Sequence, residues 1–238
     1  MKAVILAGGK GTRLKPYTIV FPKPLMPVGD KPILEIIIEQ LKNYGLTDII
    51  ISVGYLGELI TNYFGNGQRF GANISYIKED RPLGTAGGLS LLNCELKDTF
   101  LMVNGDTLTS LNFSEFITYH KQRQAIATIA LKNRSTYVDF GVIELDKTDS
   151  IEKYIEKPTF NHLVSMGVYA FEPRVLQYLN PGERVDLPDF IKLMISKDEI
   201  VKGYTFDGYW LDIGRPDDYE KANSEIEELN KMLKLVKQ

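Results

Sequence analysis

The stretch Leu6-Ala7-Gly8-Gly9-Lys10-Gly11-Thr12-Arg13-Leu14 indicates the fold of this 238-residue chain. It follows the apolar run Ala3–Ala7, which predicts a strand buried on both faces. Open α/β sheets bind ligands just beyond the carboxyl ends of such strands. Glycines at that place let backbone N–H groups approach a phosphate closely, because no Cβ atom intervenes. The stretch therefore predicts a phosphate-binding loop.

Two named phosphate-binding motifs do not fit this loop. A dinucleotide fingerprint needs a third glycine, but this position is Leu14. A Walker loop needs Ser or Thr directly after its Gly-Lys pair, but the residue after Lys10 is Gly11. A glycine-rich turn without a ligand is the alternative. Arg13 and Lys23 disfavour it, because they add cations beside the loop. Lys23 stands between two prolines, and this stiff backbone suits a cation that meets a phosphate at a fixed place.

The rest of the first half alternates strands with helices at short spacing. Strands are expected over 48–53, 74–77 and 100–103, and helices from Pro32 to Gly45, over 58–64 and over 88–92. This alternation predicts an α/β fold with a Rossmann-like, mostly parallel sheet flanked by helices.

The second half is rich in strand patterns, which are expected to extend the same sheet in antiparallel fashion. They are Ala125–Leu131, Phe140–Leu145, Ser150–Glu156 and Val164–Phe171. No linker or composition break separates the halves, so residues 1–238 are predicted to form one mixed-sheet domain. It ends in a helix over about 216–236.

Composition excludes several function classes. The net charge of −3 gives no basic excess to hold a nucleic acid. Cys94 has no disulfide or metal-ligand companion, and His120 and His162 are isolated. No apolar run is long enough for a secretory signal or a membrane span. We expect a cytoplasmic enzyme that does not bind membranes.

Several further motifs, in one order, give the chain a specific resemblance. The glycine-rich loop is followed by Lys23-Pro24-Leu25-Met26-Pro27-Val28, Pro82-Leu83-Gly84-Thr85-Ala86-Gly87, Asn104-Gly105-Asp106, Glu156-Lys157-Pro158 and Trp210-Leu211-Asp212-Ile213-Gly214. Over about residues 1–220 the chain resembles the sugar-1-phosphate nucleotidyltransferases. The resemblance implies a glycosyltransferase-A-like fold and the transfer of a nucleotidyl group from an NTP to a sugar 1-phosphate.

The resemblance also implies roles for individual residues. Arg13 would neutralise the leaving pyrophosphate, Lys23 would reach the phosphates, and Asp106 and Asp212 would hold Mg²⁺. A turn aspartate and a helix-capping aspartate are the plainer alternatives for that pair. The nucleotide would contact Leu6, Ala7, Gly8, Gly9, Gly11, Thr12, Arg13, Lys23, Glu79, Gly84 and Asp106.

The sugar and the base are less well specified. The sugar phosphate would contact Gly141, Glu156, Lys157 and Ser165, although many members carry Asn where Ser165 stands. Glu79 lies where relatives place a residue that reads the base edge, and guanine offers a carboxylate two adjacent donors. The sequence thus favours GTP with a hexose or heptose 1-phosphate, as in mannose-1-phosphate guanylyltransferases. Relatives that use UTP also carry Glu at this position.

The sequence is also compatible with other functions and with an assembly. One alternative is a uridylyl- or thymidylyltransferase acting on glucose 1-phosphate or an amino-sugar 1-phosphate. Others are a non-catalytic nucleotide-sugar-binding regulator and a glycosyltransferase, although the Asp-x-Asp of the latter is missing. The final helix carries an apolar stripe that would pack on its own domain or join a homo-oligomer: Ile226, Leu229, Leu233 and Val236.

Overall fold

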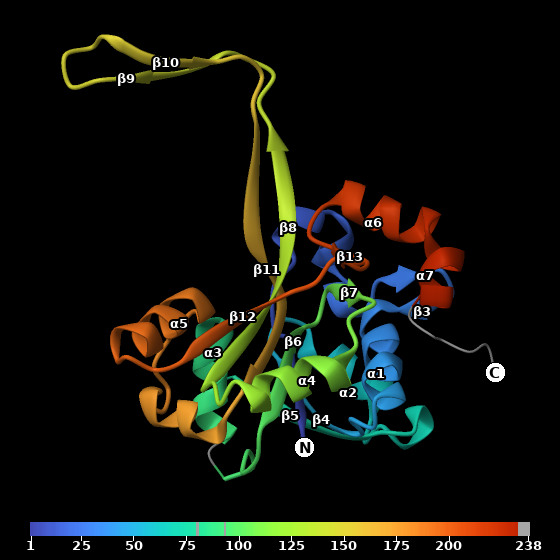
Figure 1. The fold of residues 1–238 in the computed structure, drawn as a ribbon. Helices are drawn as coiled ribbons and strands as arrows, with labels where there is room; N and C mark the ends of the chain where they lie inside the picture. The colour runs from blue at the N-terminus through green and yellow to red at the C-terminus, as the bar shows by residue number, and fades with distance from the viewer. Residues whose placement is uncertain (80, 93, 233–238) are drawn as a thin grey trace.

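A seven-stranded sheet forms the centre of the molecule in a computed structural model, which describes residues 1–79, 81–92 and 94–232 (Figure 1). Its strand order is β12-β8-β11-β6-β1-β4-β5. The strands are β1 (Ala3–Ala7), β4 (Asp48–Val53), β5 (Asn73–Lys78), β6 (Phe100–Asn104), β8 (Ala127–Tyr137), β11 (Thr159–Phe171) and β12 (Val201–Thr205).

The sheet confirms the predicted mixed, mostly parallel topology. Strands β5, β4, β1 and β6 run parallel, with Ile5 of β1 in register with Ile51 on one side and Val103 on the other. Strand β11 is antiparallel to both β6 and β8, and β12 is parallel to β8. The carboxyl ends of β1 and β6 therefore lie side by side at one edge of the sheet.

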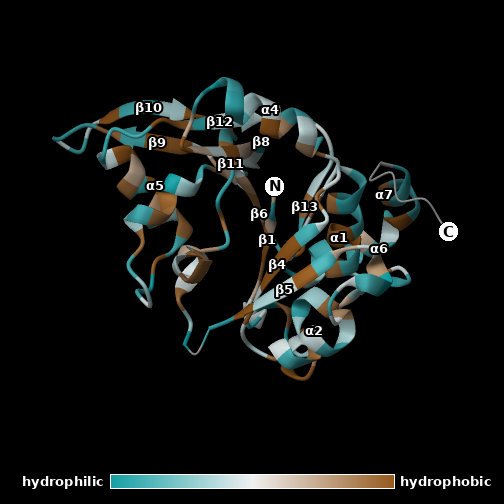
Figure 2. Ribbon diagram, turned by 90° about the horizontal axis from the view of Figure 1, so that it is seen from below, coloured by the Kyte–Doolittle hydropathy of each residue, from teal (hydrophilic) through white to brown (hydrophobic). Residues whose placement is uncertain are grey.

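Helices cover both faces of this sheet, as predicted (Figure 2). Alternate residues of β1 enter two different cores, Ile5 in one and Val4 in the other, and both are fully buried. The first core includes side chains from α1 (Ile33–Asn43), α2 (Gly57–Phe64), α4 (Phe113–Gln122), α6 (Pro216–Ser224) and α7 (Ile226–Met232). The second includes side chains from α3 (Gly84–Gly87) and α5 (Leu187–Ser196). None of the described helices has the length and apolar character needed to cross a membrane.

Short elements complete the fold. Three two-stranded ribbons are β2 (Pro27–Val28) with β3 (Lys31–Pro32), β7 (Thr107–Thr109) with β13 (Trp210–Asp212), and β9 (Val142–Leu145) with β10 (Ile151–Ile155). Turns of 3₁₀ helix occur at Thr12–Leu14, Tyr17–Ile19, Lys23–Leu25, Gln68–Phe70, Gly88–Leu92 and Pro173–Tyr178. Helix α1 starts and stops as its sequence predicts, since Pro32 caps it and the N–H of Gly45 donates to the carbonyl of Lys42 at 2.9 Å.

Two sequence-based expectations need correction. Strands β9 and β10 do not extend the main sheet but form a hairpin of their own at the far end of β8 and β11 (Figure 1). An alternating pattern fits either arrangement, so the local sequence could not distinguish them. The final helix is interrupted at Glu225 between α6 and α7, and Leu233 and Val236 lie outside the described residues.

Candidate active site

The glycine-rich loop lies where the sequence predicts, directly after β1. Gly11 has a φ of +60°, which favours glycine, and a Cβ atom there would lie 2.9 Å from the Thr18 methyl group. Its carbonyl accepts from the Leu14 N–H at 2.9 Å and from the Thr18 hydroxyl at 2.7 Å. These two bonds fix the turn that carries Thr12 and Arg13.

The loop after β6 packs directly against the carboxyl end of β1. The N–H of Gly105 donates to the carbonyl of Leu6 at 2.9 Å. A Cβ atom on Gly105 would lie 2.7 Å from that same oxygen, so only glycine permits this approach. The next residue, Asp106, is thereby placed beside the glycine-rich loop.

A small ribbon brings Asp212 next to Asp106. Strands β7 and β13 pair with Asp212 opposite Thr107, and the N–H of Ile213 donates to the Asp106 carbonyl at 3.0 Å. The two acidic residues are 106 positions apart by number, yet they occupy adjacent strand ends. The structure thus brings the predicted aspartate pair together.

Lys23 and Arg13 supply the positive charge of this region. The Lys23 ammonium donates to Asp106 Oδ2 in a direct ion pair, and Lys23 is only 8% exposed. The Arg13 guanidinium lies against Gly214, where a Cβ atom would be 3.3 Å from its nearest nitrogen. Both cations therefore lie close to the aspartate pair.

These segments enclose a pocket of about 220 Å³. Its walls come from the β1 end, the glycine-rich loop, the Lys23 turn and the β6 end: Leu6, Ala7, Gly9, Gly11, Thr12, Arg13, Lys23, Pro24, Gly105 and Asp106. Most of the residues predicted to contact the nucleotide therefore line one cavity. Gly8 does not line it and instead abuts Gly54 at the end of β4.

The electrostatics of the pair are asymmetric. Burial, and then the neighbouring Asp106 carboxylate, raise the pKa of Asp212, while Lys23 and Arg13 act in the opposite direction. Oxygen Oδ1 of Asp106 is buried and has no hydrogen-bond partner among the described residues. A buried carboxylate oxygen without a donor is rare and calls for a cation or a proton.

The aspartate pair fits a magnesium ion. Mg²⁺ commonly takes one or two carboxylates and completes its shell with water and substrate phosphate oxygens. The described residues contain no group of three or more Asp, Glu, His or Cys side chains that could form a complete cage. Asp106 with its unpartnered oxygen, and Asp212 beside it, are the residues that would hold such an ion.

Glu79 and Gly84 lie outside the pocket, Glu79 directly after β5 and Gly84 at the start of α3. Glu79 follows β5, and its carboxylate accepts from the Ser52 hydroxyl at 3.0 Å and from the Leu83 N–H at 2.7 Å. It therefore holds the turn that leads into Gly84 and α3. Each oxygen of the carboxylate retains a lone pair beyond these bonds. Contact of Glu79 with a base stays a prediction.

The residues predicted for the sugar phosphate are divided between two places. Ser165 lies near the sheet, where its hydroxyl is 2.8 Å from the Tyr169 hydroxyl. Gly141, Glu156 and Lys157 lie instead on the projecting hairpin, where Lys157 pairs with Asp139 at 2.9 Å. The structure therefore does not bring these three residues to the pocket of their own chain (Figure 1).

Comparison with known proteins identifies the family. Residues 2–229 match the family model described as nucleotidyl transferase. The chain belongs to this family. The predicted relationship to the sugar-1-phosphate nucleotidyltransferases is thereby confirmed.

The names of two relatives of this chain specify different nucleotides. It is 36% identical over 241 residues to a UTP–glucose-1-phosphate uridylyltransferase of Synechocystis, with 93% of this chain and 62% of that protein covered. It is 31% identical over 231 residues to a mannose-1-phosphate guanylyltransferase of Mycobacterium tuberculosis, with 94% and 64% covered. The chain thus spans less than two thirds of the length of these relatives.

A solved structure shares the fold of this chain. It comes from Bacillus anthracis, is assigned as a glucose-1-phosphate thymidylyltransferase and contains sucrose. The TM-score is 0.76 at 28% identity, and 94% of each chain is covered. The predicted fold class is confirmed by this similarity.

Three residues of the site were not assigned a role from the sequence. Gly105 lines the pocket, Gly214 lies against Arg13, and Ser52 orients Glu79. The two glycines could have been found from the sequence, because each lies near a predicted metal ligand. Gly105 directly precedes Asp106, and Gly214 lies two residues after Asp212. Ser52 carries none, because a serine within an apolar strand does not reveal which neighbour it will face.

Proposed function

We propose that this chain is a sugar-1-phosphate nucleotidyltransferase that forms an NDP-sugar and pyrophosphate. The observation that carries the proposal is the cluster of Arg13, Lys23, Asp106 and Asp212 around the glycine-rich loop. A polyphosphate substrate needs positive charge around its phosphates. Arg13 and Lys23 provide two cations, and the aspartate pair would hold a metal ion. The scarcity of histidine and cysteine is no obstacle, because this chemistry needs no covalent nucleophile on the protein.

The reaction is an in-line displacement at phosphorus. An oxygen of the sugar 1-phosphate attacks the α-phosphorus of the NTP, a new P–O bond forms, and the bond to the β-phosphate oxygen breaks. Backbone N–H groups of the glycine-rich loop hold the phosphates, and Arg13 neutralises the departing pyrophosphate. Lys23 keeps Asp106 in place through its ion pair and contributes positive charge beside the phosphates. Mg²⁺ bound at Asp106 and Asp212 would offset negative charge at the reacting phosphate.

We propose GTP as the nucleotide and a hexose or heptose 1-phosphate as the acceptor. The Glu79 carboxylate supports this choice, because Ser52 and Leu83 hold it in one orientation at the carboxyl end of the sheet. Guanine presents two adjacent donors, N1–H and N2–H₂, that match the two oxygens. The guanylyltransferase relative is consistent with this choice. The uridylyltransferase relative favours a second candidate, UTP or dTTP with glucose 1-phosphate or an amino-sugar 1-phosphate.

One assay tests the proposal directly. Pyrophosphate release is measured with GTP, ATP, CTP, UTP and dTTP, each against mannose, glucose, heptose and amino-sugar 1-phosphates with Mg²⁺. Turnover of one pair, with GTP preferred, is the expected result. Preference for UTP or dTTP would reject the guanine assignment and keep the enzyme class. No turnover with any pair, while NTP is still bound, would favour a non-catalytic nucleotide-binding protein.

A further inference from the structure

A two-stranded arm, residues 132–164, projects from the sheet and bends into the β9–β10 hairpin (Figure 1). Strand β12 pairs with β8 only as far as Leu131, and β6 pairs with β11 only from Val168 onward. Beyond these points β8 and β11 continue as a ladder in which Tyr137 is opposite Thr159. Among the described residues, no other strand pairs with this part of the ladder.

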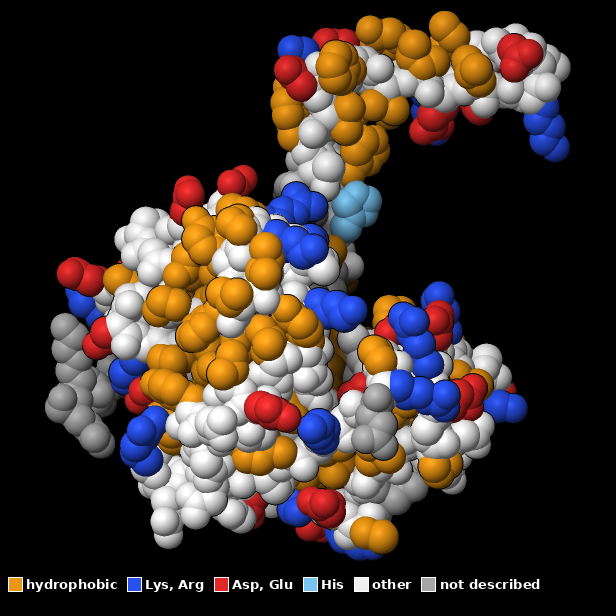
Figure 3. Space-filling view, turned by 180° about the vertical axis from the view of Figure 1, so that it is seen from behind, with side chains coloured by type: hydrophobic (Ala, Val, Ile, Leu, Met, Phe, Trp, Pro, Cys, Tyr) orange, Lys and Arg blue, Asp and Glu red, His pale blue; other side chains and the backbone are white. Residues whose placement is uncertain are grey.

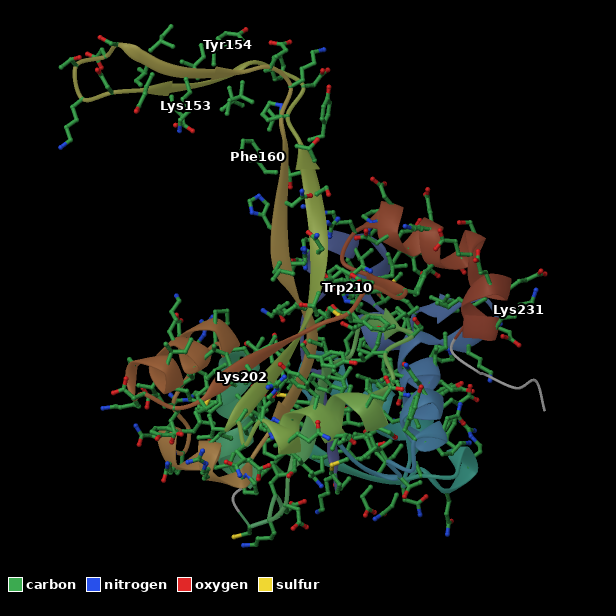
Figure 4. All side chains as sticks on the ribbon, in the orientation of Figure 1. Lys153, Tyr154, Phe160, Lys202, Trp210 and Lys231 are labelled. Atoms are coloured by element: carbon green, nitrogen blue, oxygen red, sulfur yellow. The ribbon has the colours of Figure 1, made fainter. Side chains whose placement is uncertain are left out.

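The hairpin at the end of the arm has one apolar face. Ile143 is opposite Tyr154 and Leu145 is opposite Ile151, so these four side chains lie on the same side. They are 47–64% exposed. The other side carries the Glu144–Lys153 ion pair at 2.7 Å, and Figure 4 shows Lys153 and Tyr154 on opposite sides of the hairpin. An isolated two-stranded hairpin is marginal in water, so this apolar face requires a covering surface.

The arm is held away from the pocket of its own chain. At its base, Lys132 donates to the carbonyls of Asp207 and Gly208 at 2.6 and 2.8 Å, and the Trp210 indole donates to the Met166 carbonyl at 2.9 Å. Seven paired residues, from Ser165 to Thr159, continue the ladder beyond this base. The six steps between them, at about 3.3 Å each, place the end of the ladder about 20 Å above it. Glu156 and Lys157 lie beyond that end.

A second exposed apolar surface lies at the rim of the pocket. The segment that joins Arg13 to Lys23 presents Tyr17, Ile19 and Val20, which are 57%, 53% and 75% exposed. Its backbone is nevertheless fixed, because the Tyr55 hydroxyl donates to the Ile19 carbonyl at 2.7 Å. Hydrophobic side chains gather both on the arm and on the body below it in Figure 3. The rim is therefore a preformed surface rather than a loose loop.

We propose that two copies of this chain exchange their arms, so that each arm covers the pocket rim of the other copy. The inference rests on the proposed function. It follows from the two exposed apolar surfaces. In a twofold dimer the arm of each copy would cover the rim of the other, so that both surfaces are buried in both copies. In this arrangement Glu156 and Lys157 of each copy complete the sugar-phosphate subsite of the other. Lys157 supplies a cation to the 1-phosphate, and Glu156 accepts hydrogen bonds from sugar hydroxyls.

Mixed dimers test the exchange. One chain carries Asp106→Asn, and the other carries Glu156→Gln with Lys157→Ala; each has a different affinity tag. The two are co-expressed, and heterodimers are purified through both tags. Each variant alone is expected to be nearly inactive at sugar-phosphate concentrations below the wild-type KM. The heterodimer is expected to recover about half of the wild-type activity, because one of its two sites combines an intact pocket with an intact arm.

Three outcomes of this experiment would overturn the exchange. One is a heterodimer as inactive as its parents, which would show that each arm serves its own pocket. Another is the failure of any heterodimer to pass both affinity steps. A third is a Glu156→Gln/Lys157→Ala variant with wild-type kinetics. If the wild type itself releases no pyrophosphate with any substrate pair, the proposed function fails. The exchange is then tested separately by analytical ultracentrifugation, in which a monomeric wild type would reject it.

Surface variants provide the second measurement. Ile143→Ser with Tyr154→Ser removes apolar area from the face proposed to dock and should shift the protein from dimer to monomer in analytical ultracentrifugation. Lys153→Gln, on the opposite side of the same hairpin, is the matched control and should leave the dimer intact. Circular dichroism checks that the sheet is retained. A dimer unaffected by the Ile143/Tyr154 variant would overturn the proposed interface.

Discussion

Lys23 and Asp106, 83 residues apart in the chain, form an ion pair at the wall of the glycine-rich pocket. The lysine engages one carboxylate oxygen, and the other is buried with no hydrogen-bond partner in the part of the chain that the structure describes. The pair therefore orients the free oxygen toward whatever cation the site receives. Asp212, on the neighbouring ribbon, supplies the second carboxylate.

Replacing either aspartate should remove most of the activity. Asp106→Asn and Asp212→Asn are each expected to lower kcat by about a hundredfold or more, because a metal ligand at the transferred phosphoryl group supplies several kcal/mol. The fold should survive, since both residues lie at strand ends. Asp189→Asn, on the exposed side of α5, is the control and should leave kcat unchanged. Steady-state pyrophosphate release measures all three, and near-wild-type rates for both site variants with Mg²⁺ would reject the metal assignment.

Arg13 and Lys157 should affect different kinetic constants. Arg13→Ala removes the cation proposed to face the pyrophosphate, so it should lower kcat more than it raises the KM for sugar phosphate. Lys157→Ala should mainly raise that KM. The same panel of initial rates distinguishes them. Identical effects of the two variants would show that the pyrophosphate and sugar-phosphate subsites are wrongly assigned.

The base preference should depend on Glu79. GTP is expected to surpass ITP, which lacks the 2-amino group, because a hydrogen bond to a charged carboxylate contributes about 1.5–3 kcal/mol. Ser52→Ala should weaken this discrimination, since it removes one of the two hydrogen bonds that orient Glu79. The measurement is kcat/KM for both nucleotides. Equal values in the wild type would remove Glu79 from base recognition.

The buried histidine should make stability depend on pH. His120 is fully buried between Thr128, at 2.7 Å, and Glu172, at 3.2 Å. Burial lowers its pKa below the usual 6.5, although Glu172 opposes this change. The unfolded chain therefore takes up a proton near pH 6.5 while the folded chain does not. Stability should be fully present above that pH and decline as the pH falls toward the folded pKa.

Urea unfolding of the wild type and His120→Asn between pH 7.5 and 5 measures this effect. The variant should be less stable at pH 7.5 by about 1–3 kcal/mol, because the hydroxyl of Thr128 loses a partner. The difference between the two proteins should then shrink as the pH falls below about 6.5. His162→Gln, at an exposed position, is the control. A difference that grows on acidification would mean that His120 is stabilised in its charged form.

The C-terminal helix should stabilise its own subunit. Leu229 is fully buried in the core, and Ile226 packs against the same core close to Gly29. Leu229→Ala is therefore expected to lower the free energy of unfolding by about 2–5 kcal/mol without changing the association state. Thermal unfolding and analytical ultracentrifugation measure the two quantities. An unchanged Tm with dissociation of an oligomer would instead support a partner interface at this helix.

The sequence by itself determined the buried parallel strands and the glycine-rich loop, and its family resemblance predicted Arg13, Lys23, Asp106 and Asp212 as site residues. The strands and the loop are local features, because a strand's burial follows from its apolar run and a loop's chemistry from the residues after it. Only the tertiary structure decided which of them meet. Asp106 and Asp212 become neighbours through the β7–β13 ribbon, a pairing between segments too distant in the chain for any local pattern to reveal. The position of β9 and β10 was likewise open, because alternating hydropathy fits a sheet strand and a projecting hairpin equally well.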